Sequence, residues 1–215
     1  MLYPLIDTNY KPDAVILANG DYPTHPIPAG VLQRAPYICC CDGAAMQLAA
    51  HGLQPDAIVG DGDSLSNEQK QRFQHILHLE SEQDDNDLTK ATRHCKALGF
   101  NTIAYLGATG KREDHTLGNI SLMARYMDEM GINATLFTDY GWFTSAKGEA
   151  QYESFEGQQV SIFNLTCTKI EAEGLKWQPY AYQQWWQGTL NEAMGCSFSL
   201  HTDGLFMVFR TYNRK

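Results

Sequence analysis

Six short apolar runs, each followed by turn residues or an acidic loop, constrain the fold of this 215-residue chain most strongly. They lie at residues 14–18, 37–41, 57–59, 76–79, 102–106 and 134–138. Helix-like segments separate them, near residues 44–51, 66–75, 88–98 and 115–130. Short apolar runs that alternate with helical patterns are typical of buried parallel strands in βαβ units. The sequence therefore predicts an α/β fold with a parallel sheet covered on both faces.

The pattern changes after about residue 141. Helical periodicity fades, and strand-like segments separated by glycines follow at residues 159–163, 167–172, 196–201 and 205–212. Such a series predicts a small antiparallel β-sandwich or barrel. We therefore expect an N-terminal parallel-sheet α/β domain at residues 1–142, followed by a smaller antiparallel β-sandwich at residues 143–215. Residues 141–150 would form a short joint between them.

The composition narrows the class of function. The formal net charge is −9, and an acidic protein repels nucleic acid and anionic membrane surfaces. The acids concentrate between residues 42 and 87, where ten acidic residues stand against two basic ones. This run is either a solvated acidic face or part of a cation site. The six cysteines form no Cys-x-x-Cys pair, and the N-terminus lacks a signal-peptide pattern. We expect free thiols and a cytoplasmic protein without membrane spans.

Acidic residues stand where the predicted strands end. Asp42 and Asp61 each directly follow an apolar run or its closing glycine, and Asp63 comes two residues later. Ligands of open α/β sheets bind outside the carboxyl ends of the strands, so these acids should converge on one crevice. Two carboxylates two residues apart offer hard oxygen ligands to one or two cations. The same loop also fits an Asx turn, with Ser64 or Ser66 capping the next helix.

Two further segments combine acids, bases and glycines. Asp87 and Lys90 are three residues apart at a predicted helix start, so they share one face and suit a metal–polyphosphate complex. Asp85 or Asn86 can equally act as a helix cap. The loop at residues 107–115 follows a strand and opens a helix, so its backbone N–H groups and Arg112 can hold an anion. It lacks the Walker A pattern, and Lys111 and His115 also fit an ordinary turn and a packed or capping histidine.

Taken together, these motifs resemble the thiamine pyrophosphokinase (thiamine diphosphokinase) family in order and spacing across about residues 14–120. The matching segments are Asp42-Gly43 and residues 60–64, 83–90 and 107–119, and in the C-terminal part residues 157–163, residues 174–177 and Asn191-Glu192. Departures are Ala108 and Lys111 at glycine positions of the family, and Leu190 at a serine position. The resemblance implies an α/β nucleotide domain, a following β-sandwich and a homodimer.

The resemblance also implies an activity: transfer of diphosphate from ATP to the hydroxyl of thiamine, giving thiamine diphosphate and AMP, with Mg²⁺ as cofactor. Residues 1–142 would bind ATP and metal. Residues 143–215 would bind thiamine and form the dimer, with the active site shared between subunits. The implied metal ligands are Asp61, Asp63 and Asp87, and the implied phosphate-holding side chains are Lys90 and Arg112. The implied nucleotide contacts are Asp42, Gly43, Gly107, Thr109, Gly110 and Arg112. The implied thiamine contacts are Gln83, Asp114, Asn191 and the aromatic Phe206, with Trp177 as the other candidate.

Two other functions agree with parts of the pattern. A metal-dependent phosphohydrolase would explain the acids but leaves Lys90, Arg112 and the appended sandwich without a role. A non-catalytic nucleotide or thiamine sensor would need the same cleft but no metal. Incubation with ATP, Mg²⁺ and thiamine distinguishes these two functions from diphosphate transfer by the products that form.

Overall fold

The six predicted apolar runs form six neighbouring parallel strands in the computed structural model, which describes residues 1–82 and 84–214. Their spatial order is β7-β6-β2-β3-β4-β5. Their bounds are Ala14–Leu17 (β2), Ile38–Cys41 (β3), Ala57–Gly60 (β4), Leu77–Leu79 (β5), Thr102–Leu106 (β6) and Asn133–Phe137 (β7). Every residue of β2, β3 and β4 is buried, as strands covered on both faces must be. The predicted parallel sheet is confirmed.

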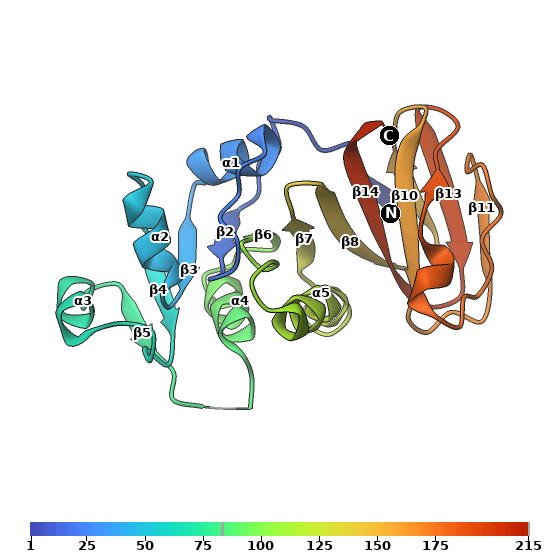
Figure 1. Cartoon of the computed structure of the whole chain (residues 1–215). Helices are drawn as coiled ribbons and strands as arrows, with labels where there is room; N and C mark the ends of the chain where they lie inside the picture. Colours follow the sequence, from blue (N-terminus) through green and yellow to red (C-terminus); the bar gives the residue numbers. More distant parts are fainter. Residues whose placement is uncertain (83, 215) are drawn as a thin grey trace.

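Helices cover both faces of this sheet (Figure 1). Their bounds are Pro26–Gln33 (α1), Ala44–Ala50 (α2), Asn67–Arg72 (α3), Glu113–Asp128 (α5) and, between the last two, Asp87–Ala97 (α4). On β2, Val15 and Leu17 pack with α1 and α2, whereas Ala14 and Ile16 pack with α4 and α5. The helix α1 was not predicted, because its prolines usually mark turns and loops. Proline is tolerated in a first helical turn, where the missing N–H has no helical partner.

The C-terminal part extends the same sheet with antiparallel strands and adds a second sheet. The large sheet continues from β7 through β8 (Gly141–Lys147), β14 (Leu205–Arg214), β10 (Gln158–Asn164) and β12 (Asn191–Glu192). The second sheet has the order β1 (Leu2–Tyr3), β9 (Ala150–Glu153), β13 (Ser197–Thr202) and β11 (Ile170–Glu173), and a short 3₁₀ helix spans Trp185–Gly188. Side chains from both sheets share one core, so the predicted antiparallel sandwich is confirmed.

Residues 141–150, expected to be a joint, are mostly strand. β8 pairs with β7 on one side and with β14 on the other, so the large sheet runs through this region without interruption. Trp142 of β8 packs in the core under α1 and α2, and Ala146 packs in the core of the sandwich. This strand therefore belongs to both cores. No helix within the described ranges is long and apolar enough to cross a membrane.

A buried arginine ties the N-terminal segment to the sandwich. Arg210 on β14 is 1% exposed, and its guanidinium donates hydrogen bonds to the carbonyl oxygens of Glu153 at 2.6 Å and Pro4 at 3.1 Å. The guanidinium carbon Cζ of Arg210 lies 4.8 Å from the ring centroid of Trp142 and 5.1 Å from that of Tyr152. Burial lowers the pKa of Arg210 to about 10. Arg210 thus supplies hydrogen-bond donors to two part-buried backbone carbonyls.

We expect Arg210→Ala to lower the free energy of unfolding by about 3 kcal/mol or more, because it leaves a cavity and buried carbonyls without donors. Chemical denaturation measures this change. Arg214→Ala, an exposed position on the same strand, is the matched control and should change stability by about 0.5 kcal/mol or less. Equal effects of the two substitutions would contradict the role assigned to Arg210.

Candidate functional site

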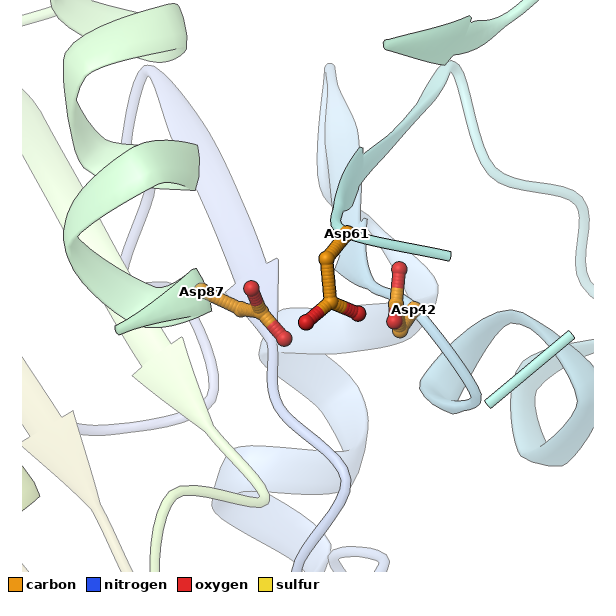
Figure 2. A group of neighbouring side chains, drawn as sticks. All are labelled: Asp42, Asp61 and Asp87. Carbon is orange, nitrogen blue, oxygen red and sulfur yellow. The ribbon is translucent and has the colours of Figure 1, made fainter. Parts of the chain in front are cut away.

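Three aspartates from separate βα units meet at the carboxyl edge of the parallel strands. Asp42 follows β3, Asp61 follows β4, and Asp87 is the first residue of α4. Figure 2 shows their carboxylates pointing toward one another, and one oxygen from each lies within 4.8 Å of the others. Three oxygens this close are an arrangement that Mg²⁺ accepts, because Mg²⁺ takes a few carboxylates and completes its octahedron with water or phosphate.

Local backbone geometry holds Asp42 in this group. Its φ angle is 38°, a left-handed conformation that aspartate tolerates better than most residues. Its carboxylate accepts hydrogen bonds from the backbone N–H of Gly62 at 3.1 and 3.2 Å. A Cβ at Gly60 would lie 2.2 Å from Oδ1 of Asp42. Glycine at position 60 therefore makes the space into which this carboxylate fits.

The clustered charges change the acidity of the carboxyl groups. Burial, and after it the charge of Asp87, raises the pKa of Asp42 to about 6. Burial also raises the pKa of Asp87, and the neighbouring Lys90 opposes this shift. Both raised pKa values mean that the ionised form of these carboxyl groups is destabilised in the site. A bound cation would relieve this cost, so the donor set fits a divalent metal ion.

Lys90 stands beside the carboxylates from within α4. Its Nζ lies 3.4 Å from Oδ1 of Asp87, and its side chain is 2% exposed. The two residues are one helical turn apart, as the sequence predicted. Asn86 caps the helix by accepting a hydrogen bond from the N–H of Thr89 at 3.0 Å, so the predicted cap and the predicted acid–base pair are both present.

A glycine-lined loop faces the carboxylates from β6. Gly107 and Gly110 have φ angles of 62° and 80°, and the N–H of Gly20 donates to the carbonyl of Gly107 at 2.6 Å. A Cβ at Gly20 would lie 2.2 Å from the carbonyl oxygen of Thr109, so the two loops pack backbone to backbone. Lys111 also has a positive φ, 58°, and its ammonium donates to the carbonyl of Asn19 at 2.8 Å. Lys111 is thus part of the site, although it also fitted an ordinary turn.

Arg112 directly precedes α5, and its guanidinium group points at the carboxylate of Asp114. Its Nε donates to Oδ1 of Asp114 at 3.0 Å, and its Nη2 donates to the other carboxylate oxygen. Both side chains are exposed, and this pairing lowers the pKa of Asp114 to about 2. Arg112 therefore holds a carboxylate in the two-point geometry that it would offer to a phosphate.

A cleft of about 320 Å³ brings these groups together, and we refer to it as the first cleft. Predicted residues that line it are Asp42, Asp87, Gly107, Gly110 and Arg112. Further lining residues, for which the sequence predicted no ligand contact, are Asn19, Ser64, Asn86, Lys111, His115 and Asn119. Asn119 donates to the carbonyl of Ala108 at 2.8 Å and accepts from Asn86 at 3.2 Å, so it joins α4, α5 and the loop. Asn119 lies in the segment at residues 107–119 that resembles the family. That resemblance is the sequence signal by which Asn119 could have been predicted as a site residue.

The remaining predicted residues lie around or away from this cleft. Asp63 is exposed beside the cluster, and its N–H donates to Oδ1 of Asp61 at 2.9 Å. Gly43 packs on Asn19, and a Cβ there would lie 3.0 Å from Nδ2 of Asn19. Thr109 lines a neighbouring cleft instead. Gln83 lies outside the described residues.

Two predicted thiamine contacts lie in the sandwich. Phe206 is 0% exposed in its core, and a ring without exposed surface offers no face to a ligand, so a stacking role does not fit this structure. Asn191 lines a pocket of about 260 Å³ together with Trp177. Its side-chain amide accepts from the N–H of Trp177 at 3.2 Å and donates to the carbonyl of Trp177 at 2.7 Å. Asn191 thereby positions Trp177, whose side chain is 53% exposed.

Two family models match the chain in succession. The model described as thiamin pyrophosphokinase, catalytic domain, matches residues 29–136. The model described as thiamin pyrophosphokinase, substrate-binding domain, matches residues 141–209. The first covers the segments that carry Asp42, Asp61, Asp87 and Arg112, and the second covers most of the sandwich.

Two curated proteins are similar over shorter stretches. Thiamin pyrophosphokinase 1 of Caenorhabditis elegans is 31% identical over 104 residues, which is 44% of this chain and 42% of that protein. Thiamine pyrophosphokinase of Bacillus subtilis (strain 168) is 33% identical over 86 residues, which is 38% of this chain and 40% of that protein. The chain thus matches about two fifths of the length of these curated relatives.

Solved structures share the fold over nearly the whole chain. A crystal structure of thiamine pyrophosphokinase from Bacillus subtilis has a TM-score of 0.75 at 20% identity, covering 93% of this chain and 99% of that chain. Thiamin pyrophosphokinase from Candida albicans has a TM-score of 0.77 at 17% identity, covering 99% of this chain and 92% of that chain. These likenesses show that the arrangement of an α/β part followed by a sandwich is shared.

The raised pKa of Asp42 predicts a pH-dependent stability in the presence of EDTA. Its pKa is about 6 in the folded protein against a usual 3.8, so between these values the folded protein binds more protons than the unfolded chain. The free energy of unfolding should therefore fall as pH rises through this window. Asp42→Asn removes the titration, so its stability relative to wild type should grow by roughly 2–3 kcal/mol between pH 4 and pH 7. Denaturation series at each pH measure the difference, and a constant difference would contradict the assignment.

Proposed function

Because this chain belongs to the thiamin pyrophosphokinase family, we propose that it transfers the diphosphate group of ATP to the hydroxyl of thiamine, giving thiamine diphosphate and AMP. The observation that carries this proposal is the first cleft. Asp42 and Asp87 of the carboxylate cluster line it together with Lys111 and Arg112. A cation and a polyphosphate need acidic and basic groups in one cleft.

We assign Mg²⁺ to Asp61 and Asp87, as the sequence predicts, and add Asp42, because its oxygens lie in the same group. Asp63 keeps its predicted role as a ligand, since it is exposed beside Asp61. Bound there, Mg²⁺ would neutralise phosphate charge and lower the pKa of the attacking hydroxyl. The described carboxylates suffice for this without a separate general base.

The basic residues orient the donor. Arg112 and Lys111 line the cleft and would bind phosphate oxygens, together with backbone N–H groups of the loop that carries Gly107 and Gly110. Lys90, buried against Asp87, would balance charge as it builds on the transferred group. When ATP binds, the guanidinium of Arg112 would leave Asp114 and bind the phosphates. The carboxylate of Asp114 would then lie near the acceptor, thiamine.

The transfer itself is a displacement at phosphorus. The hydroxyl oxygen of thiamine forms a bond to the β-phosphorus and loses its proton to solvent water, while the bond from the β-phosphorus to the α,β-bridging oxygen breaks. AMP leaves with that electron pair. Catalysis then depends mainly on holding the oxygen and the phosphorus in line and on neutralising charge.

We further propose that the sandwich supplies the thiamine site and the contact surface of a homodimer. Several large apolar side chains of this part are exposed, namely Trp177, Tyr180, Trp185, Trp186, Leu190 and Met194. An exposed apolar surface of this kind marks an interaction site. Trp177, beside the pocket of about 260 Å³, replaces Phe206 as the proposed stacking aromatic. The division into a catalytic part at residues 1–142 and a thiamine-binding part at residues 143–215 remains our proposal, as does a cytoplasmic location, which the buried free thiols favour.

One assay tests the proposed activity. The purified chain is incubated with ATP, Mg²⁺ and thiamine, and the products are separated by chromatography. AMP and thiamine diphosphate in equal amounts support the proposal. ADP or free phosphate would indicate another transfer or hydrolysis, and ligand binding without any product would indicate a sensor.

We expect Asp87→Asn and Asp61→Asn to lower kcat by about 100-fold or more, because a neutral amide cannot hold the cation as a carboxylate does. Mg²⁺ affinity, measured by calorimetry, should fall in parallel while the thermal unfolding midpoint is retained. Glu68→Gln on α3 removes an exposed carboxylate outside the cluster and serves as the control. Wild-type turnover in either aspartate variant would remove that residue from the metal site.

Arg112→Lys should lower kcat by about tenfold, because an ammonium cannot make the two parallel hydrogen bonds of a guanidinium. Steady-state kinetics with ATP and thiamine measure the loss. Arg72→Lys, an exposed position on α3, makes the same chemical change outside the cleft and should leave kcat unaltered. Unchanged kinetics in Arg112→Lys would exclude a bidentate role for this residue.

A further inference from the structure

Two histidines are in ring contact at the edge of the large sheet, outside the first cleft. His78 lies on β5, the edge strand of that sheet, and His94 lies in the last turn of α4. Their ring centroids are 4.4 Å apart, and the ring planes are tilted by 46°. Neither residue belongs to the segments that resemble the motifs of the family, so the proposed transfer gives this pair no role.

The histidine pair is separate from the carboxylate cluster. His94 follows Asp87 by seven residues on α4, which places it about 10 Å further along the helix axis. His78 pairs with Val59 inside the sheet, whereas Asp61 stands beyond the carboxyl end of β4. The group of close ligand atoms around Asp61 contains no histidine. Any ligand of the two imidazoles would therefore occupy a site of its own.

A tyrosine engages one nitrogen of the pair. The hydroxyl of Tyr37 lies 3.1 Å from Nε2 of His94, and the tyrosine ring packs on Phe100 with centroids 5.0 Å apart. In the tautomer whose Nε2–H donates to this hydroxyl, the lone pair of His94 is on Nδ1. Across residues 1–82 and 84–214, neither this Nδ1 nor either ring nitrogen of His78 has a hydrogen-bond partner. Both rings thus keep a nitrogen that can accept a ligand.

The spacing and the charge state of the pair suit a transition-metal ion. An ion that binds two imidazoles at about 2.0–2.1 Å in tetrahedral geometry holds their nitrogens roughly 3.3 Å apart, which sets the ring centroids about 5 Å apart. The observed 4.4 Å is close to this, and His78 is exposed, so its side chain can rotate to adjust. Burial, and after it the neighbouring His78, lowers the pKa of His94. A lowered pKa keeps the ring neutral at physiological pH, and the neutral ring is the form that ligates a metal.

We propose that His78 and His94 bind one divalent transition-metal ion of the Zn²⁺ type, with water in its remaining positions. Imidazole suits Zn²⁺, Ni²⁺ and Cu²⁺, whereas Mg²⁺ takes oxygen ligands, so this site and the carboxylate cluster select different ions. The ion ties the edge strand β5 to α4, the helix that carries Asp87 and Lys90. It stabilises the fold, because the two rings come together only in the folded chain. This inference is independent of the proposed transfer.

Calorimetric titration of the metal-free chain with Zn²⁺ tests the site. Excess Mg²⁺ is present to compete for the carboxylate cluster, and all proteins carry Cys196→Ser, because that exposed thiol is itself a Zn²⁺ ligand. His78→Ala and His94→Ala should each lower the affinity of one Zn²⁺ per chain by about 100-fold or more, because each removes one of two protein ligands. His75→Ala, at an exposed histidine outside the pair, is the matched control and should bind Zn²⁺ as the wild type does.

Tyr37→Phe distinguishes a metal site from a pair of rings that only stack. It keeps the ring on Phe100 and removes the hydroxyl that holds Nε2 of His94. Zn²⁺ affinity should fall about tenfold, because the tautomer of His94 is no longer fixed. In the wild type, free Zn²⁺ at about 100 times its Kd should raise the thermal unfolding midpoint by about 5 °C or more, and His78→Ala should abolish this rise.

The inference is overturned if His78→Ala binds Zn²⁺ as tightly as the wild type, because the ion then lies elsewhere. This variant decides even if His94→Ala fails to fold, since His78 is exposed and its truncation leaves the core intact. An unchanged affinity in Tyr37→Phe would remove the hydroxyl from the site. A midpoint that does not rise with Zn²⁺ in the wild type would show that the ion does not join β5 to α4.

Discussion

Three carboxylates with oxygens within 4.8 Å repel one another, and the rest of the site is organised around that repulsion. The protein accommodates it in part with the N–H of Gly62 and with the ammonium of Lys90. The raised pKa of Asp42 and of Asp87 shows that these partners do not fully compensate the charge. A divalent cation held by these carboxylates would supply what is missing. Under the proposed function, metal binding and phosphate binding would therefore depend on each other at this edge of the sheet.

The glycines of the site matter as much for its geometry as the charged residues do, because they leave space for neighbouring oxygen atoms. Gly60 leaves room for the carboxylate of Asp42, Gly110 for that of Asp21, and Gly20 for the carbonyl of Thr109. At each position a Cβ would lie within 2.2 Å of an oxygen atom. These close approaches pack the loop after β3 against the end of β4, and the loop after β2 against the loop after β6.

Local patterns predicted most of the elements that carry the site. The strands that precede Asp42, Asp61 and Gly107, and the helix that carries Asp87 and Lys90, follow from short apolar runs and helix signals within each segment. α1 was missed because Pro26 and Pro28 are read as breakers unless the start of the helix is known. β8 was missed because its nearly continuous burial depends on the two cores that it joins.

Local sequence specifies which chemical groups follow which strand, because strands, caps and glycine turns are encoded over a few neighbouring residues. Which of those groups meet depends on the tertiary arrangement. It placed Asp42 with Asp61 and Asp87 and brought Lys111 to the first cleft. It also turned Phe206 into the sandwich core while Trp177 stayed exposed. These outcomes depend on strand order and on the direction of each side chain against distant segments, and no short stretch of sequence contains that information.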